Sequence, residues 1–158
     1  MEISSTTQSL QDKFAPQSIC FGCGPNNPHG LKIKSFVEGS KVVASFTPKP
    51  YHHAFPSILN GGIIGAILDC HCNWAASWYF MQKNQLNEPP CTVTAEYKVK
   101  LKKPTPINCE LTLIAELNEI GQKKAIVSAN LIANNQVYDE FTGIFIIVKP
   151  SHPAYHRW

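Results

Sequence analysis

The residues most suited to chemistry are a lone carboxylate and a pair of glycines on one apolar stretch. Asn60-Gly61-Gly62 opens this stretch, which continues to about Phe80 with Asp69 as its single acidic residue. Amides at the start of a helix attract negative charge, and two glycines let a ligand approach the backbone closely. The carboxylate two turns further along therefore suggests a site in a narrow cleft, where burial would disfavour its charged form. The alternative is an Asp that hydrogen-bonds a neighbouring element or faces water.

A long helix is expected to position these groups. No proline lies between Pro56 and Pro89, and Asn60 is a preferred N-cap residue. At about 100° per residue, the bulkier side chains fall on one broad side, which we expect to pack on a sheet. They are Ile63, Ile64, Ile67, Leu68, His71, Trp74, Ala75 and Trp78. Asp69 points the other way, among mostly small neighbours.

Strand patterns flank the helix on both sides. We expect two strands before the helix, over residues 31–37 and 42–46, and four after it, over residues 91–103, 109–117, 124–133 and 137–148. The segments 20–31 and 48–59 are rich in glycine, proline or histidine and are expected to be loops. Residues 1–17 are expected to form a flexible arm and residues 150–158 a tail. The result is a single α+β domain over residues 18–149, with one helix on an antiparallel sheet.

Length and composition fit one globular domain of low charge. The chain has 158 residues, of which 16% are charged, and a net charge of +3. Its lysines are dispersed apart from a group between residues 98 and 103, so we expect no nucleic-acid partner. No segment reaches transmembrane length and the first 13 residues hold no apolar signal core. We therefore expect a soluble cytoplasmic protein with no membrane partner and with six reduced cysteines.

Three motifs together resemble a known family. The first is the strand-strand-helix-four-strand order, with Asp69 nine positions after Asn60. The second is the loop Cys20-Phe-Gly-Cys-Gly-Pro-Asn-Asn-Pro-His-Gly-Leu31, and the third is the strand Thr92-Val-Thr-Ala-Glu-Tyr-Lys-Val-Lys-Leu-Lys-Lys-Pro104. Across residues 18–148 the chain resembles the hotdog-fold acyl-CoA thioesterases, especially the phenylacetate-pathway and hydroxybenzoyl-CoA subgroup.

This resemblance implies a fold, a substrate and an assembly. A hotdog domain would form homodimers or dimers of dimers, with an acyl-CoA site where two subunits meet. The Gly61 amide would polarise the thioester carbonyl, and Asp69 would activate water or attack as a nucleophile. Thr94, from the partner's strand, would hold the water or the carboxylate. Four further residues are expected to contact substrate: Asn60, Gly62, His53 and, at the coenzyme A phosphates, Lys102.

Two departures from the family pattern keep a second function open. The family's usual residue before the glycines is His, and this chain has Asn60. Relatives often carry an Asn in the loop before the helix, where this chain has Ala54, next to His52 and His53. His53 is one substitute for that Asn; the alternative is that both histidines are ordinary loop residues. The chain is thus either a thioesterase or a non-catalytic protein that binds acyl-CoA or another acyl ligand.

The cysteines raise the further possibility of a metal site. Cys20-x-x-Cys23 and Cys70-His71-Cys72 hold enough soft ligands for tetrahedral zinc. However, residues 70, 71 and 72 point about 100° apart on a helix and cannot all converge, and His71 lies on the side expected to meet the sheet. We therefore expect no metal and no cofactor.

Overall fold

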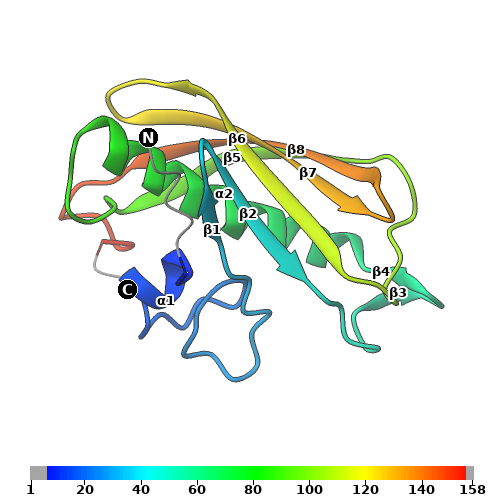
Figure 1. Ribbon diagram of the computed structural model, residues 1–158. Helices are drawn as coiled ribbons and strands as arrows, with labels where there is room; N and C mark the ends of the chain where they lie inside the picture. The colour runs from blue at the N-terminus through cyan, green and yellow to red at the C-terminus, as the bar shows by residue number, and fades with distance from the viewer. Residues whose placement is uncertain (1–6, 156–158) are drawn as a thin grey trace.

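One long helix lies across a six-strand antiparallel sheet in the computed structural model, which describes residues 7–155 (Figure 1). The helix is α2 (Gly61–Lys83). The strands follow the order β1-β2-β6-β7-β8-β5 across the sheet. Their bounds are β1 (Phe36–Glu38), β2 (Lys41–Phe46), β5 (Thr92–Leu101), β6 (Leu111–Ile120), β7 (Lys124–Ala133) and β8 (Gln136–Ile147). The predicted α+β arrangement, with one central helix, is confirmed.

The start of α2 follows from its capping residue. Asn60 has an extended backbone, and its side-chain oxygen accepts a hydrogen bond from the Ile63 amide at 3.2 Å. Ile67, Leu68 and Phe80 of the same helix are fully buried against the sheet. Alternating residues of β6 and β7 supply the facing side of the core, as the period-two pattern of their sequences requires.

A short helix, α1 (Leu10–Phe14), lies inside the segment expected to be a flexible arm. Leu10 and Gln11 are buried, and the Gln11 side chain donates to the Ser35 hydroxyl at 2.9 Å and accepts from the Ser35 amide at 2.8 Å. The prediction for residues 1–17 is therefore wrong over α1, because five residues are too few to show a helical period. Residues 1–6 of that arm and residues 156–158 of the tail lie outside the described part of the chain.

The loop that enters α2 also holds more structure than expected. A small hairpin of β3 (His53–Phe55) and β4 (Ile58–Leu59) lies within residues 48–59. The first predicted strand is shorter than expected, since it begins at Phe36 and not at residue 31. Residues 31–35 instead form a connection that packs beside α1 and α2 through Ile33 and Ser35, both buried.

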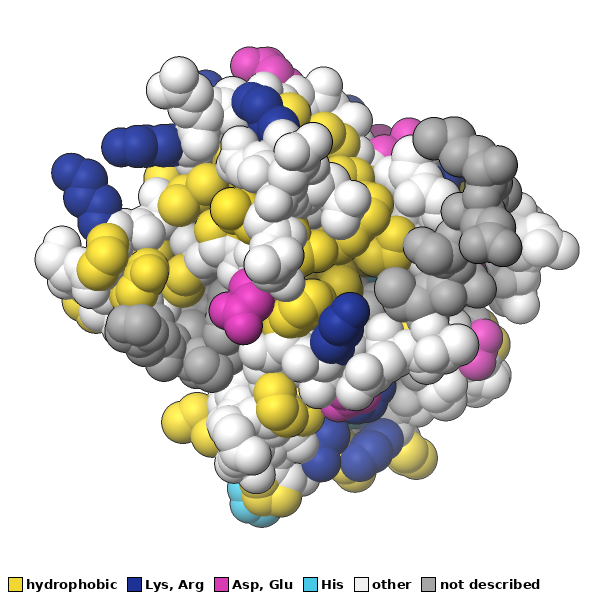
Figure 2. Space-filling model, turned by 60° about the vertical axis from the view of Figure 1, so that its left-hand side comes forward, with side chains coloured by type: hydrophobic (Ala, Val, Ile, Leu, Met, Phe, Trp, Pro, Cys, Tyr) yellow, Lys and Arg dark blue, Asp and Glu magenta, His cyan; other side chains and the backbone are white. Residues whose placement is uncertain are grey.

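Charged side chains are a minority on the face that Figure 2 shows, in agreement with the low charge of the sequence. Hydrophobic side chains gather in a patch on this face, and lysine side chains lie singly or in small groups around it. Between residues 7 and 155, no helix is long and apolar enough to cross a bilayer.

Candidate active site

Asp69 and Thr94 are joined across the gap between α2 and β5. The Thr94 hydroxyl donates a hydrogen bond of 2.6 Å to Oδ1 of Asp69, and both residues are half-buried. A hydroxyl-to-oxygen distance this short is typical of a bond to an ionised carboxylate. The contact lies within one chain, whereas we had expected Thr94 of the partner to reach Asp69. The structure thus pairs these two predicted site residues without a second subunit.

A β-bulge at Ala95 explains how both Thr94 and Tyr97 face the helix although they are three residues apart. On β5, Thr94 pairs with Phe145 of β8 and Glu96 pairs with Ile144, so Ala95 is an extra residue. Such a bulge shifts the alternation of the strand by one position. Thr94 lies on the helix side before the bulge, and Tyr97 lies on it after the bulge, near Gly65 of α2.

The next turn of α2 is tied to the same strand. The Thr92 hydroxyl donates to Oδ1 of Asn73 at 2.7 Å, and the Asn73 amide donates to the Thr92 carbonyl at 3.3 Å. The Ser77 hydroxyl lies 2.6 Å from that of Thr92. These contacts fix the distance between β5 and α2 beside Asp69, so the Thr94 hydroxyl is held within reach of the carboxylate.

The start of α2 opens on a cavity of about 280 Å³. Its wall is mostly apolar and includes Gly61, and two lysines and one acid interrupt it. The lining residues are Ala54, Phe55, Ile58, Leu59, Gly61, Ile64, Leu101, Lys102, Lys103, Pro104, Thr105 and Asp139. Because the Asn60 side chain caps Ile63, the amides of Gly61 and Gly62 remain among the helix-end donors that have no intrahelical acceptor. An apolar cavity with a few polar groups and a helix N-terminus suits an acyl or thioester group.

The other residues expected to contact substrate are only partly brought to this cavity. Lys102 lines it, and its ammonium group lies 2.9 Å from the Glu140 carboxylate in an exposed ion pair. Gly62 is exposed beside Gly61, and Asn60 serves as the helix cap. His53 is exposed on β3 and is not among the lining residues.

Asp139 is a buried acid on the cavity wall that sequence reasoning missed. It is fully buried, and its Oδ2 accepts a 2.6 Å hydrogen bond from the Thr105 hydroxyl. Its Oδ1 has no hydrogen-bond partner within the described chain. Burial raises the pKa of Asp139, and the Thr105 bond opposes this rise. The sequence held one sign of this buried acid: Asp139 lies two positions before Phe141 in a strand pattern, so both side chains point to the inward face of β8.

Asp69 and the Gly61 cavity are separate within one chain. The two positions are eight residues apart on α2, and a rise of about 1.5 Å per residue places them roughly 12 Å apart along the helix axis. Within one chain, the Asp69 carboxylate and the Gly61 amide are therefore too far apart to act on the same thioester.

His71 is a neutral core residue, as its position on the helix indicated. Its Nε2 donates to the Val42 carbonyl at 2.9 Å, so Nδ1 accepts from the Ser35 hydroxyl at 2.8 Å. Complete burial lowers the pKa of His71 to about 4, although the bond to Val42 raises it. Cys72 is also buried. Neither His71 nor Cys72 joins Cys70 in a group of possible metal ligands among the residues that the structure describes.

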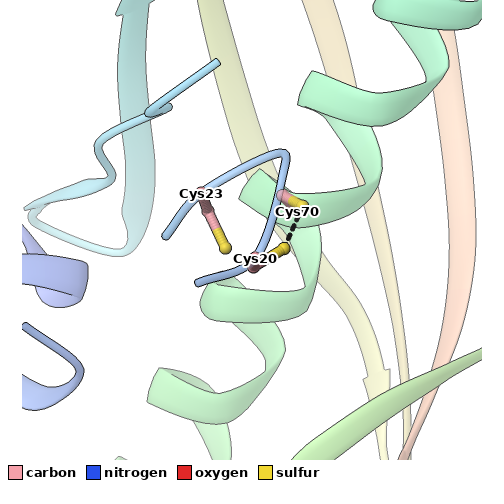
Figure 3. Close-up of side chains that lie close together, drawn as sticks. All are labelled: Cys20, Cys23 and Cys70. Atoms are coloured by element: carbon pink, nitrogen blue, oxygen red, sulfur yellow. Dashed lines mark hydrogen bonds between the residues drawn. The ribbon is translucent and has the colours of Figure 1, made fainter. Parts of the chain in front are cut away.

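Cys70, by contrast, meets the two cysteines of the entry loop (Figure 3). Its Sγ lies 3.7 Å from that of Cys20, and all three sulfur atoms of Cys20, Cys23 and Cys70 lie within 4.8 Å of one another. Hydrogen bonds from the Cys23 and Cys70 thiols lower the pKa of Cys20, and the amides of Cys23 and Gly22 add to this effect. The helical spacing gave no sign of this cluster, because only one of its members is on the helix.

The sequence was compared with protein-family models and with curated proteins. No protein-family sequence model matches the chain. The acyl-coenzyme A thioesterase THEM4 of Bos taurus is 23% identical over 145 residues, which cover 89% of this chain and 56% of that protein. The chain thus spans little more than half the length of this curated relative.

Solved structures give the stronger match. A thioesterase superfamily protein from Shewanella loihica is 29% identical, with a TM-score of 0.65 and coverage of 79% of this chain and 98% of that one. The E. coli PaaI protein from the phenylacetic acid degradation operon is 13% identical, with a TM-score of 0.64 and coverage of 75% and 81%. The chain therefore has the hotdog fold, and it is similar to proteins of the thioesterase superfamily.

Proposed function

We propose that this protein hydrolyses acyl-CoA thioesters to a free acid and coenzyme A. The observation that carries the proposal is the Asp69 carboxylate, oriented by Thr94, on the same helix whose glycine start opens on an apolar cavity. The likeness to an acyl-coenzyme A thioesterase supports the choice of substrate. The reaction needs a base or nucleophile and a place for a developing oxyanion, and these two features supply them.

Each group has a defined part in the reaction. The thioester carbonyl oxygen accepts a hydrogen bond from the Gly61 amide, which is stronger once the oxygen carries negative charge. Asp69 either takes a proton from the attacking water or attacks the carbonyl carbon itself, and Thr94 holds its Oδ1 in place. The C–S bond then breaks, and the thiolate of coenzyme A leaves and takes up a proton. If Asp69 itself attacked, a water molecule then hydrolyses the resulting acyl-Asp69 anhydride, which releases the free acid and restores the carboxylate.

A homodimer would bring the two halves of the site together. β5 is at one end of the sheet, so one of its edges has no neighbouring strand within the described chain. Tyr97 and Leu101 lie on this strand with 48% and 58% of their surface exposed, which is unusual for large side chains on the helix-facing side. Antiparallel pairing of β5 with its copy would cover both side chains and continue the sheet.

The positions of the residues on β5 support this pairing. Thr94 lies beside Asp69, and Leu101 lies beside Gly61. A twofold axis near Tyr97 and Lys98 would set Thr94 of one chain opposite Leu101 of the other. Asp69 would then face the partner's helix start, which removes the separation of roughly 12 Å along α2.

The charged rim of the cavity suits coenzyme A. Lys102 and Lys103 line the cavity, and their side chains carry positive charge next to an otherwise apolar wall. The acyl or pantetheine chain would occupy the apolar part of the cavity. The phosphates of coenzyme A would replace the Glu140 carboxylate as the partner of the Lys102 ammonium group.

A non-catalytic acyl-CoA-binding protein is the second candidate. The observation that favours it is the apolar wall at Ala54, where the family often has an Asn, together with Asn60 in place of His. Without the loop Asn and the His that the family uses at these positions, a water molecule at the thioester would have fewer hydrogen-bond partners to orient it.

A hydrolysis screen over short, long and aromatic acyl-CoAs tests the proposal, with the release of free coenzyme A thiol as the measured signal. Asp69→Asn keeps an oxygen for the Thr94 bond but removes the base, so turnover should fall by about 10²- to 10⁴-fold. Glu38→Gln, at an exposed carboxylate on β1, is the matched control and should retain full activity. Full activity in Asp69→Asn would overturn the assignment, and tight binding of acyl-CoA without hydrolysis would favour the second candidate.

A further inference from the structure

Three cysteine thiols from two distant parts of the chain converge on one point. Cys20 and Cys23 come from the loop before β1, and Cys70 comes from the middle of α2. In Figure 3 the three side chains point toward one another from the loop and the helix. They are free thiols, and their sulfur atoms all lie within 4.8 Å of one another. Thiols are among the ligands that soft and borderline metal ions prefer.

The sulfur spacing fits a tetrahedral ion. Zinc–sulfur bonds of about 2.3 Å at tetrahedral angles place two sulfur ligands roughly 3.8 Å apart. Cys20 and Cys70 are separated by 3.7 Å, and Cys23 is close enough to complete a triangle with small side-chain rotations. A disulfide would join two of these sulfur atoms and leave the third without a role, whereas one metal ion engages all three.

The loop is shaped to bring its sulfur atoms to the helix. A Cβ atom at Gly22 would overlap Sγ of Cys70, so a larger residue there would displace this sulfur atom. Gly24 is more tightly restricted, because its Cβ would meet backbone atoms of Ser18 and Cys20. The Gly24 amide donates to the Cys20 carbonyl at 2.8 Å and closes the turn. Gly24 is therefore required by the turn, and Gly22 leaves room for the Cys70 sulfur beside the loop.

A fourth ligand position opens into a small cavity. This cavity has a volume of about 260 Å³ and is lined by the three cysteines together with Ser18, Ile19, Asn73 and Trp74. It is large enough for a water molecule or a small ligand, and a tetrahedral ion with three protein ligands keeps one such position. Cys20 is exposed, so an ion can enter from solvent.

We propose that Cys20, Cys23 and Cys70 bind one zinc ion as thiolates, with the fourth position facing this cavity. Each thiol releases its proton to solvent when it binds, and the complex carries a net charge of −1. The ion fastens the loop before β1 to α2 one residue after Asp69. This proposal revises our expectation of no metal, which weighed Cys20-x-x-Cys23 together with Cys70-His71-Cys72 and rejected them because the three helix residues cannot all converge. It does not depend on the proposed hydrolysis.

Cobalt substitution provides a direct test. Protein purified under reducing conditions without a metal-binding tag should contain one zinc per chain by elemental analysis. After the metal is removed by a chelator, anaerobic addition of Co²⁺ should produce the thiolate-to-cobalt absorption of a tetrahedral sulfur site, which saturates at one equivalent. Zinc should abolish this absorption and raise the melting temperature of the apoprotein.

Single serine variants identify the ligands. Cys20→Ser, Cys23→Ser and Cys70→Ser should each lose stoichiometric zinc and the cobalt absorption, whereas Cys109→Ser, outside the cluster, should keep both. Cys20 is exposed, so its variant should fold even if the Cys70 variant does not, as circular dichroism would show. The proposal is wrong if wild-type protein gives no cobalt absorption, or if the folded Cys20 variant binds metal like wild type. It is equally wrong if the isolated protein holds a Cys20–Cys70 disulfide, with a mass lower by two hydrogen atoms and no metal.

Discussion

The Thr94 hydroxyl donates its hydrogen to Oδ1 of Asp69 over 2.6 Å, from the position in β5 that directly precedes a bulge. The bond holds one carboxylate oxygen in a fixed direction on a helix face that is otherwise formed by small side chains. If Asp69 acts on a thioester, this contact helps to set the position of its carboxylate, and a displacement of about 1 Å can cost about 10²-fold in rate.

Thr94→Val should weaken hydrolysis while leaving the shape of the strand unchanged. Hydrogen bonds to charged groups contribute about 1.5–3 kcal/mol, which corresponds to a decrease of roughly 10- to 100-fold in kcat/KM. Thr94→Ser retains the hydroxyl and should stay close to wild type. Steady-state kinetics with the best substrate of the screen measures both variants, and equal rates would show that the hydroxyl has no part in catalysis.

Tyr97→Asp should disrupt the proposed dimer and the activity together. Tyr97 lies on the free edge of the sheet with 48% of its surface exposed, and a carboxylate there would meet its own copy across the twofold axis. Loss of an interface residue of this kind costs about 2 kcal/mol, or about 30-fold in dimer affinity. Light scattering after size exclusion reports the assembly.

The control for this prediction is Tyr51→Asp, at a tyrosine that is 69% exposed and lies outside the six-strand sheet. It should remain dimeric and active. A Tyr97→Asp monomer that hydrolyses acyl-CoA at the wild-type rate would show that one chain holds a complete site.

The long elements could be predicted from the sequence because their patterns extend over many residues. The helix could be predicted from Asn60 and from its apolar side, and the last four strands from their strand-like sequence patterns. α1 and the β3–β4 hairpin were missed because elements of two to five residues show no period. Their stability comes from tertiary contacts such as those of Gln11 with Ser35.

The site was predicted in part, and the bulge shows why. Strict alternation from Thr94 places Glu96, Lys98 and Lys100 on the helix side, and nothing in the local sequence marks Ala95 as an extra residue. The structure instead turns the lysines outward and sets Tyr97 and Leu101 beside α2. The meeting of Cys70 with Cys20 was equally hidden, since the two residues are 50 positions apart and their approach depends on the loop fold.

Gly143→Ala should destabilise the core of the sheet. A Cβ atom at Gly143 would lie 2.7 Å from the Phe145 ring and 2.8 Å from the Phe141 ring, both buried. Overpacking of this kind costs about 1–3 kcal/mol in the free energy of unfolding. Gly121→Ala makes the same substitution at a turn, where the added carbon would lie 3.6 Å from the nearest atom, the Lys124 carbonyl oxygen. Urea unfolding should separate the two variants, and equal midpoints would contradict the packing at Gly143.

Asp139→Asn should stabilise the protein at neutral pH and remove part of its pH dependence. Burial raises the pKa of Asp139 above its ordinary value of 3.8, so the folded chain binds this proton more tightly than the unfolded chain does. Wild-type stability should therefore decrease as the pH rises from about 3.8 through the raised pKa, and the loss should persist at higher pH. The carboxamide carries no charge and can still accept the Thr105 hydrogen bond, so the variant avoids this loss.

Melting temperatures of wild type and Asp139→Asn, measured across this pH range, should converge in acid and diverge in favour of the variant toward neutral pH. Glu119→Gln removes an exposed carboxylate of β6 and should follow the wild-type curve. Because Asp139 lines the cavity at Gly61, a ligand that donates a hydrogen bond to its Oδ1 would satisfy the buried oxygen and reduce the stabilising effect of the substitution. A variant that is less stable than wild type at neutral pH would mean that the Asp139 carboxylate is stabilised in the folded protein and not penalised by burial.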